Sequence, residues 1–268
     1  MADVIVEAKS VSKSYPIRAG ILRRHIGMVQ AVDQVSCALA GGETLGLVGE
    51  SGSGKTTLAK LLIGLMQPTE GEILVQGQSF ARLRGKALLA ARRSVQCVFQ
   101  NPMNSLNPRM TVEETLSEPL IIHRVVTAPQ RRRRVRKLLS LVQLPASHAS
   151  RLPRELSGGE RQRVGIARAL ATNPDALICD EPIASLDVSV GATILQLLRS
   201  LCEARRMALL FISHDLRAVA FLCERIAVMK EGRFIESGPT RDLLSHPRHS
   251  YTELLIRSAE LDLNAPTS

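Results

Sequence analysis

The sequence predicts an α/β fold, and three observations lead to it. Continuous apolar strands such as Ala176–Cys179 alternate with helical stretches such as Val190–Ala204 along the second half of the chain. Strands that are apolar on both faces are typical of a parallel sheet covered by helices. A glycine-rich segment, residues 49–54, separates an apolar strand from a helix, which is the arrangement of a phosphate-binding loop.

The composition is that of a folded protein with an excess of positive charge. The chain has 268 residues, of which 45% are hydrophobic and 22% are charged, and this excludes wholesale disorder. Lysine and arginine number 35 against 25 acidic residues, which gives a formal net charge of +10. This excess suits an anionic partner, whether a nucleotide, a nucleic acid or lipid headgroups, and does not choose among them.

Membrane and targeting signals are not expected. No apolar run approaches the 18 residues of a membrane-spanning helix. The segment Met1–Glu7 lacks the basic and apolar regions of a signal peptide, so we expect a cytoplasmic chain. The five cysteines are scattered, which favours buried, reduced thiols over disulfides or a metal site.

Short strands and one helix are predicted for the first 100 residues. Apolar segments bounded by turn residues predict five strands: Val4–Glu7, Val35–Leu39, Glu43–Gly49, Gly71–Gly77 and Ser94–Phe99. Leucines at positions 58, 61, 62 and 65 follow helical spacing, which predicts an amphipathic helix over Lys55–Met66.

A helical subdomain is expected at residues 101–172, inserted into the α/β core. Strand signals are absent from Met110 to about Leu144, while leucines and valines recur at helical spacing. A helix over Arg161–Leu170 follows, and strands and helices then alternate to residue 229. The main domain is therefore expected to span residues 4–238. The segment Arg241–Ala259 reads as a helix, so residues 239–268 are expected to form a C-terminal helical extension.

One motif predicts a nucleotide site. Residues 49–56 read Gly-Glu-Ser-Gly-Ser-Gly-Lys-Thr and fit the pattern G-x-x-x-x-G-K-[ST] between a strand and a helix. The glycines let backbone N–H groups and the helix N-terminus point at phosphate oxygens. Lys55 is expected to reach the β- and γ-phosphates, and the Thr56 hydroxyl to bind Mg²⁺. The motif thus indicates a P-loop NTPase.

A pair of carboxylates follows the buried strand Leu177–Cys179. A magnesium ion at a phosphate loop needs an acidic partner at the end of another buried strand. Asp180 is expected to hold this metal ion. Glu181, one residue further into the site, is expected to polarise the attacking water.

A second motif carries a resemblance to a known family. Residues 156–163 read Leu-Ser-Gly-Gly-Glu-Arg-Gln-Arg, and together with the phosphate loop they resemble the signature of ABC-type ATPases. The resemblance covers residues 4–238 and implies a RecA-like core with an antiparallel β edge and an inserted α-helical subdomain. It departs from the usual family pattern at three places, namely Glu160, Cys179 and Ala184-Ser185.

The resemblance also implies roles for individual residues. Gln100 matches the Q-loop residue, His214 the switch histidine, and Asp187 the end of the D-loop, while Tyr15 lies where an aromatic side chain stacks on adenine. The implied catalytic residues are Glu181, His214, Gln100 and Lys55, and the implied Mg²⁺ ligands are Thr56, Gln100 and Asp180. The implied ATP contacts are Tyr15, Gly49, Glu50, Ser51, Gly52, Ser53, Gly54, Lys55, Thr56, Thr57, Ser157, Gly158, Gly159 and Asp187.

The family resemblance further implies a shared site. In ABC-type ATPases the signature of one subunit completes the nucleotide site of another, so that two chains enclose two ATP molecules. Ser157 can cap the helix that follows it, and the amides of Gly158 and Gly159 can approach a phosphate closely.

Two segments are similar to those of importers for dipeptides, oligopeptides and nickel: Gln100–Arg109 and His246–Thr252. These importers have two different ATPase subunits, and the stretches Ile17–Asp33 and Gly54–Lys60 are more similar to the second subunit than to the first. The resemblance therefore implies a heterodimer with a homologous ATPase subunit. Two integral membrane permeases and an external solute-binding protein are the other implied partners. The implied location is peripheral, on the cytoplasmic face of the inner (plasma) membrane. Peptides are the first expected cargo, and nickel or another metal complex is the second.

Two other function classes fit the sequence less well. A soluble ABC ATPase acting on nucleic acid or the ribosome would suit the positive charge, but DNA-repair members of the family contain long coiled coils and translation members join two ATPase modules. This chain has no sustained heptads and one phosphate loop. The basic run Arg131–Lys137 belongs to an amphipathic helix and is expected to be a solvated face, with a position near anionic lipid beside a membrane subunit as the alternative, so no direct nucleic-acid contact is expected. A freestanding P-loop kinase would leave the Ser157–Gly159 motif unexplained.

Overall fold

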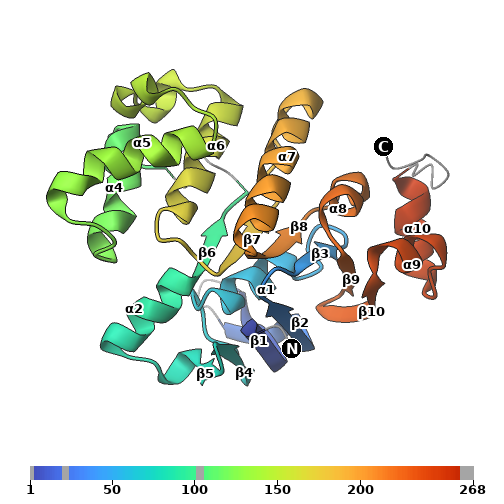
Figure 1. Ribbon diagram of the computed structural model, residues 1–268. Helices are drawn as coiled ribbons and strands as arrows, with labels where there is room; N and C mark the ends of the chain where they lie inside the picture. Colours follow the sequence, from blue (N-terminus) through green and yellow to red (C-terminus); the bar gives the residue numbers. More distant parts are fainter. Residues whose placement is uncertain (1–2, 20–23, 101–105, 260–268) are drawn as a thin grey trace.

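Two sheets form the body of the molecule. The computed structural model describes residues 3–19, 24–100 and 106–259. One sheet has six strands in the order β10-β9-β3-β8-β7-β6, and the other has four in the order β2-β1-β4-β5 (Figure 1). In the six-stranded sheet all neighbours are parallel except the β9–β10 pair, and the four-stranded sheet is antiparallel. The predicted α/β class is confirmed.

The bounds of the strands follow the chain. In the six-stranded sheet they are β3 Thr44–Val48, β6 Val95–Val98, β7 Ala176–Asp180, β8 Ala208–Ile212, β9 Arg225–Lys230 and β10 Arg233–Pro239. In the antiparallel sheet they are β1 Val4–Ala19, β2 Arg24–Ala40, β4 Glu70–Val75 and β5 Gln78–Ser79.

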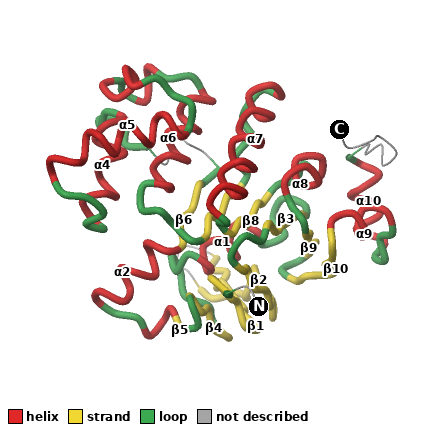
Figure 2. Tube along the Cα trace, in the orientation of Figure 1, coloured by secondary structure: helices red, strands yellow, loops and turns green. Residues whose placement is uncertain are grey.

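The helices lie beside and between the sheets, and α4, α5 and α6 form a group at one end, away from the antiparallel sheet (Figure 2). The α-helices of the described residues are α1 Lys55–Leu62, α2 Gly85–Ser94, α4 Val112–Ile122, α5 Arg131–Leu141, α6 Gly158–Leu170, α7 Val188–Arg205, α8 Leu216–Leu222, α9 Thr240–Ser245 and α10 Ser250–Ser258. In the part of the chain that the structure describes, no helix is both long and apolar enough to span a membrane.

The parallel strands divide the core into two clusters because successive side chains point to opposite faces. In β8, Leu209 and Phe211 pack with the helices of residues 106–171 and with α7 and α8, whereas Leu210 and Ile212 pack with α1 and the antiparallel sheet. Helix α1 is therefore held between the two sheets. This places its N-terminus, and the loop before it, at the carboxyl end of β3.

Two differences from the sequence predictions concern the N-terminal strands and α1. The first two strands are much longer than Val4–Glu7 and Val35–Leu39, because β1 and β2 pair over nearly their whole lengths through several bulges. Positive φ angles at Ser10 and Gln34 accompany this irregular pairing. The helix predicted over Lys55–Met66 ends at Leu62, since Gly64 adopts a φ of 65° against the ring of Phe80.

The other differences lie in α2 and in the C-terminal segment. Helix α2 was not predicted, although its Ala91 packs in the core. The single helix expected over Arg241–Ala259 is wrong, because α9 ends at Ser245 and α10 begins at Ser250. Pro247 lies in the break, and proline disfavours helical backbone at the residue before it, here His246.

Gly46 gives a test of the packing between sheet and helix. A Cβ atom at Gly46 in β3 would lie 2.2 Å from Cγ1 of Val219 in α8, so Gly46→Ala should destabilise the fold by about 1–3 kcal/mol. Gly165→Ala in α6 is the matched control, because an added Cβ meets nothing within 4 Å there, and it should be neutral or slightly stabilising. Equilibrium unfolding in urea measures both. Equal effects of the two variants would contradict this packing.

Candidate active site

The phosphate-loop motif lies between β3 and α1, where it is wedged between two other parts of the chain. Gly49 has a φ of 151°, and a Cβ there would lie 2.1 Å from the carbonyl oxygen of Met229. Gly54 has a φ of 107°, and a Cβ there would lie 2.1 Å from the carbonyl oxygen of Ala31. The loop is further tied to the β9–β10 turn by a hydrogen bond of 2.9 Å from the Gly232 N–H to the Ser53 carbonyl. Only glycine fits at both contact points.

Lys55 lies buried at the centre of the loop. Its ammonium donates hydrogen bonds to the carbonyl oxygens of Gly49 at 2.8 Å and Glu50 at 2.7 Å. Burial lowers the pKa of Lys55, and the nearby charges of Glu181 and Asp180 oppose this shift. The loop therefore presents a positive charge together with a helix N-terminus, an arrangement suited to a phosphate chain.

An oxygen-rich group of side chains adjoins the start of α1. The Thr56 hydroxyl donates to Oδ1 of Asp180, the last residue of β7, at 3.2 Å. Asp180 is buried, and this burial raises the pKa of its carboxyl. Hydroxyl and carboxylate oxygens are ligands that Mg²⁺ accepts, so the residues fit this ion. Among the described residues no group of three or more His, Cys, Asp and Glu side chains could hold a metal ion.

Three of the predicted catalytic residues meet at one carboxylate. The Gln100 amide donates to Oε2 of Glu181 at 2.9 Å, and Nδ1 of His214 lies 3.4 Å from the same oxygen. Glu181 has a φ of 47°, a left-handed conformation that is uncommon for a residue with a side chain. Its backbone N–H donates to the Ile212 carbonyl at 2.9 Å, which fixes this turn to the neighbouring strand β8.

These groups line one pocket of about 650 Å³. Its lining contains most of the residues predicted from the two phosphate-site motifs, together with two that the family resemblance implied, Gln100 and His214. The former are Gly49, Glu50, Ser51, Gly52, Gly54, Lys55, Thr56, Thr57 and Glu181. Ser53 and Asp180 are not in its lining, although both contact residues that are. The pocket can therefore hold a phosphorylated ligand with an acid, an amide and an imidazole at one edge.

The signature motif and Asp187 lie outside this pocket. Helix α6, which begins at the signature motif, packs against α7, which follows Asp187. The Ser157 hydroxyl oxygen caps α6 by accepting a hydrogen bond from the Glu160 N–H, and the Glu160 carboxylate accepts one from the Ser157 N–H. A Cβ at Gly159 would lie 2.5 Å from Cγ1 of Val190 in α7, the helix that Asp187 precedes. The Ser157 side chain is exposed, so this cap faces away from the core.

Comparisons with known proteins identify the family. The pattern of the family described as ABC transporter matches residues 32–184, more than half of the chain. The chain belongs to the ABC transporter family. Its fold is that of an ABC-type ATPase, as the resemblance implied, and ATP is its nucleotide.

The relatives cover nearly the whole chain. It is 45% identical over 257 residues to the oligopeptide transport ATP-binding protein AppF of Bacillus subtilis (strain 168), which is 96% of this chain and 78% of that protein. It is 47% identical over 259 residues to the probable peptide ABC transporter ATP-binding protein y4tS of Sinorhizobium fredii, which is 97% of this chain and 73% of that protein. A solved dimer of the ATP-binding cassette MJ0796 in a post-hydrolysis state with ADP and Pi gives a TM-score of 0.77 at 33% identity, over 88% of this chain and 99% of that one.

Tyr15 is not placed in the pocket of this ABC-type ATPase. It is 38% exposed on β1, its hydroxyl donates to the Met66 sulfur at 3.2 Å, and the Lys13 ammonium lies 5.6 Å from the ring centre. Its stacking on adenine stays a prediction. The importer-like segment at Gln100–Arg109 lies partly outside the described residues, since 101–105 are not described, and so does part of Ile17–Asp33.

Sequence reasoning missed the part that the C-terminal extension plays in the site. Leu255 of α10 lines the pocket, and Tyr251 of the same helix accepts a hydrogen bond from the Glu50 N–H. The segment His246–Thr252 is similar to importer segments, and this similarity marks it in the sequence. Its local pattern does not indicate that it contacts the phosphate loop.

The buried carboxyl of Asp180 gives a test of the site. Because burial raises its pKa in the folded chain, stability is lost as the pH rises from the ordinary carboxyl value through the raised one. Asp180→Asn should therefore raise the unfolding midpoint at pH 7 by about 1–4 °C while weakening Mg²⁺-dependent hydrolysis. For the unfolding midpoint alone, the exposed Asp187, which makes no capping hydrogen bond, provides the control Asp187→Asn, which should leave the midpoint unchanged. A lower midpoint for Asp180→Asn would contradict this reading of the site.

Proposed function

We propose that this chain is the ATP-hydrolysing subunit of a membrane importer and powers the uptake of peptides. The observation that carries the proposal is the 45–47% identity to peptide-transport ATPases over at least 96% of this chain. The intact phosphate loop and signature support it, because in this family the phosphate loop of one subunit and the signature of another together enclose ATP. Uptake of nickel or another metal complex is the alternative for the same machinery.

In the proposed reaction the loop binds the triphosphate. The N–H groups of the loop and of the first turn of α1 surround the phosphate oxygens, and Lys55 reaches the β- and γ-phosphates. Thr56, Asp180 and Gln100 would hold Mg²⁺, which supplies charge neutralisation of the phosphates when it is bound. The contact between Thr56 and Asp180 supports this assignment.

Glu181 is the proposed general base. Its Oε2 takes the proton of the attacking water, and Gln100 and His214, which already contact this oxygen, orient the carboxylate and the water. The left-handed backbone of Glu181 supports a functional role, because such strain persists where the surroundings enforce it. His214 is also proposed to donate a hydrogen bond to the γ-phosphate.

A second subunit is proposed to complete the site. The exposed cap at Ser157, with Gly158 and Gly159, lies outside this chain's own nucleotide pocket and is free to face a partner's ATP. The solved relative MJ0796 is a dimer, which supports an arrangement of two cassettes. We propose that the partner is a homologous ATPase and that Asp187 and Tyr15 complete the ATP contacts.

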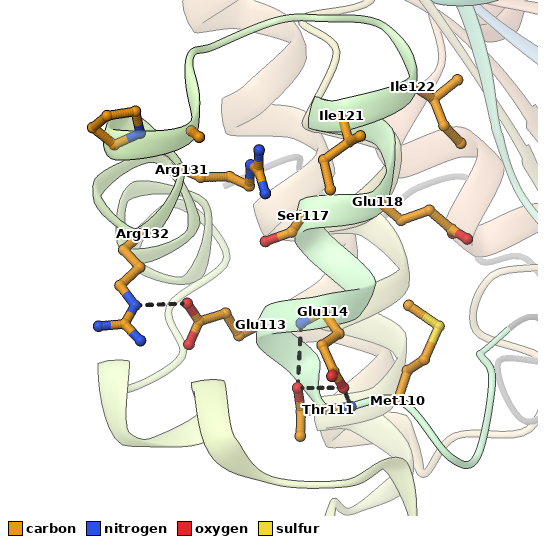
Figure 3. Close-up of a pocket in the computed structure, with 12 residues that line it drawn as sticks. Met110, Thr111, Glu113, Glu114, Ser117, Glu118, Ile121, Ile122, Arg131 and Arg132 are labelled. Atoms are coloured by element: carbon orange, nitrogen blue, oxygen red, sulfur yellow. Dashed lines mark hydrogen bonds and ion pairs between the residues drawn. The ribbon is translucent and has the colours of Figure 1, made fainter.

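The helical group is the proposed permease contact. A second pocket lies between α4 and the start of α5, with Glu113 paired to Arg132 at its wall (Figure 3). Ile121 and Ile122 at its rim are 51% and 55% exposed, which is unusual for neighbouring isoleucines on a helix. Two permeases, an external solute-binding protein and a peripheral position on the cytoplasmic face of the membrane belong to this proposal.

Uptake by cells tests the proposed function. In cells that carry Lys55→Ala in place of the natural chain, the uptake of a labelled short peptide should fall by about 100-fold or more, because the β/γ-phosphate charge loses its cation. Uptake of nickel should be unchanged. Loss of nickel uptake with normal peptide uptake would move the proposal to metal complexes, and normal uptake of both would overturn it.

A further inference from the structure

The C-terminal extension reaches back to the phosphate loop. The backbone N–H of Glu50, the second residue of the loop, donates a hydrogen bond of 3.0 Å to the hydroxyl oxygen of Tyr251 in α10. The two residues are 201 positions apart in the sequence. Tyr251 is only 6% exposed, whereas Glu50 is exposed, so the bond is partly buried, and a backbone donor that loses its partner there costs free energy.

Both backbone polar groups of Glu50 are engaged. Its N–H binds Tyr251, and its carbonyl oxygen accepts a hydrogen bond of 2.7 Å from the ammonium of Lys55. Lys55 is the cation that must meet the phosphates. A shift of the Glu50 backbone would therefore move one of the acceptors that fix the position of the Lys55 ammonium.

Tyr251 is itself held firmly. The Lys230 ammonium at the end of β9 lies 4.8 Å from the centre of the Tyr251 ring. The backbone N–H of Tyr251 donates a hydrogen bond of 3.0 Å to Nδ1 of His249. The carboxylate of Glu236 in β10 accepts the N–H groups of Arg248 and His249, at 2.9 and 3.1 Å. The turn before α10 is thus anchored to the sheet edge that also supports the phosphate loop.

The chemistry of the hydroxyl suits this role. Burial raises the pKa of Tyr251, so the group stays protonated and uncharged at neutral pH. A neutral oxygen can accept the Glu50 N–H without bringing a negative charge beside the site of an anionic ligand. One turn further along α10, Leu255 contributes to the wall of the same pocket.

We propose that Tyr251 is a positioning residue for ATP. Its hydroxyl fixes the Glu50 backbone and, through the Glu50 carbonyl, the ammonium of Lys55, so that the C-terminal extension sets how tightly this chain holds the triphosphate. This inference rests on the proposed function, because it takes the loop as the ATP site. It adds a residue outside the phosphate loop and the signature to the determinants of nucleotide affinity.

Tyr251→Phe tests the proposal, since it removes the oxygen and keeps the ring. We expect the Kd for MgATP, measured by equilibrium binding to the full chain, to rise about three- to tenfold. The kcat of the assembled transporter should stay within about twofold, because the Lys55 ammonium is retained and saturating ATP restores its position. Leu254→Ala, at an exposed position of the same helix, is the matched control and should leave the Kd unchanged.

A second variant, which leaves Tyr251 unchanged, tests the proposal even if Tyr251→Phe fails to fold. Glu236→Gln can accept only one of the two N–H groups at the turn before α10, so it should shift the Kd in the same direction by a smaller factor. If wild type binds MgATP and Lys55→Ala does not, yet Tyr251→Phe binds it as tightly as wild type, the positioning role is overturned. If wild type fails to bind MgATP at all, the proposed function itself fails.

Discussion

The phosphate loop fits between two backbone carbonyls, and the rest of the nucleotide site depends on this fit. Gly49 faces the carbonyl of Met229 and Gly54 faces that of Ala31, at distances that no side chain could tolerate. The loop cannot move toward either carbonyl without displacing the β9–β10 hairpin or β2. A rigid loop presents its N–H groups without reorganisation, which is what binding of a phosphate chain requires.

The same sheet positions the groups for hydrolysis. Asp180 ends β7 and Glu181 follows it, and His214 follows the end of β8, so the parallel order of strands brings the proposed metal ligand, the proposed base and the imidazole to one edge of the sheet. The cap of α6 at Ser157 lies outside this pocket and instead packs beside the start of α7. The chain therefore carries one phosphate pocket of its own and, at Ser157, one surface that is proposed to complete the site of a partner.

Much of this could be predicted from the sequence, because the deciding interactions are local. The phosphate loop, the carboxylates after β7 and the Ser157 cap each depend on residues a few positions apart, and the structure places them as short patterns indicate. The predictions that failed depend on distant partners or on a single residue. The helix expected over Arg241–Ala259 is broken at one residue, Pro247, and the length of β1 depends on its pairing with β2. The bond from Glu50 to Tyr251 spans too many residues for any local pattern to indicate it.

The claim that two subunits share each site is tested most directly by ATP-dependent association with the homologous partner ATPase. Glu181→Gln keeps the size and hydrogen bonding of the side chain but cannot accept a proton, so ATP should bind and persist. Ser157→Arg should leave this chain's own Lys55 able to bind ATP, while its long cation blocks the space for the partner's γ-phosphate. We expect ATP to produce stable dimers with Glu181→Gln and none with Ser157→Arg, measured by light scattering after size exclusion. Equal dimer formation by the two variants would contradict a site completed by the partner.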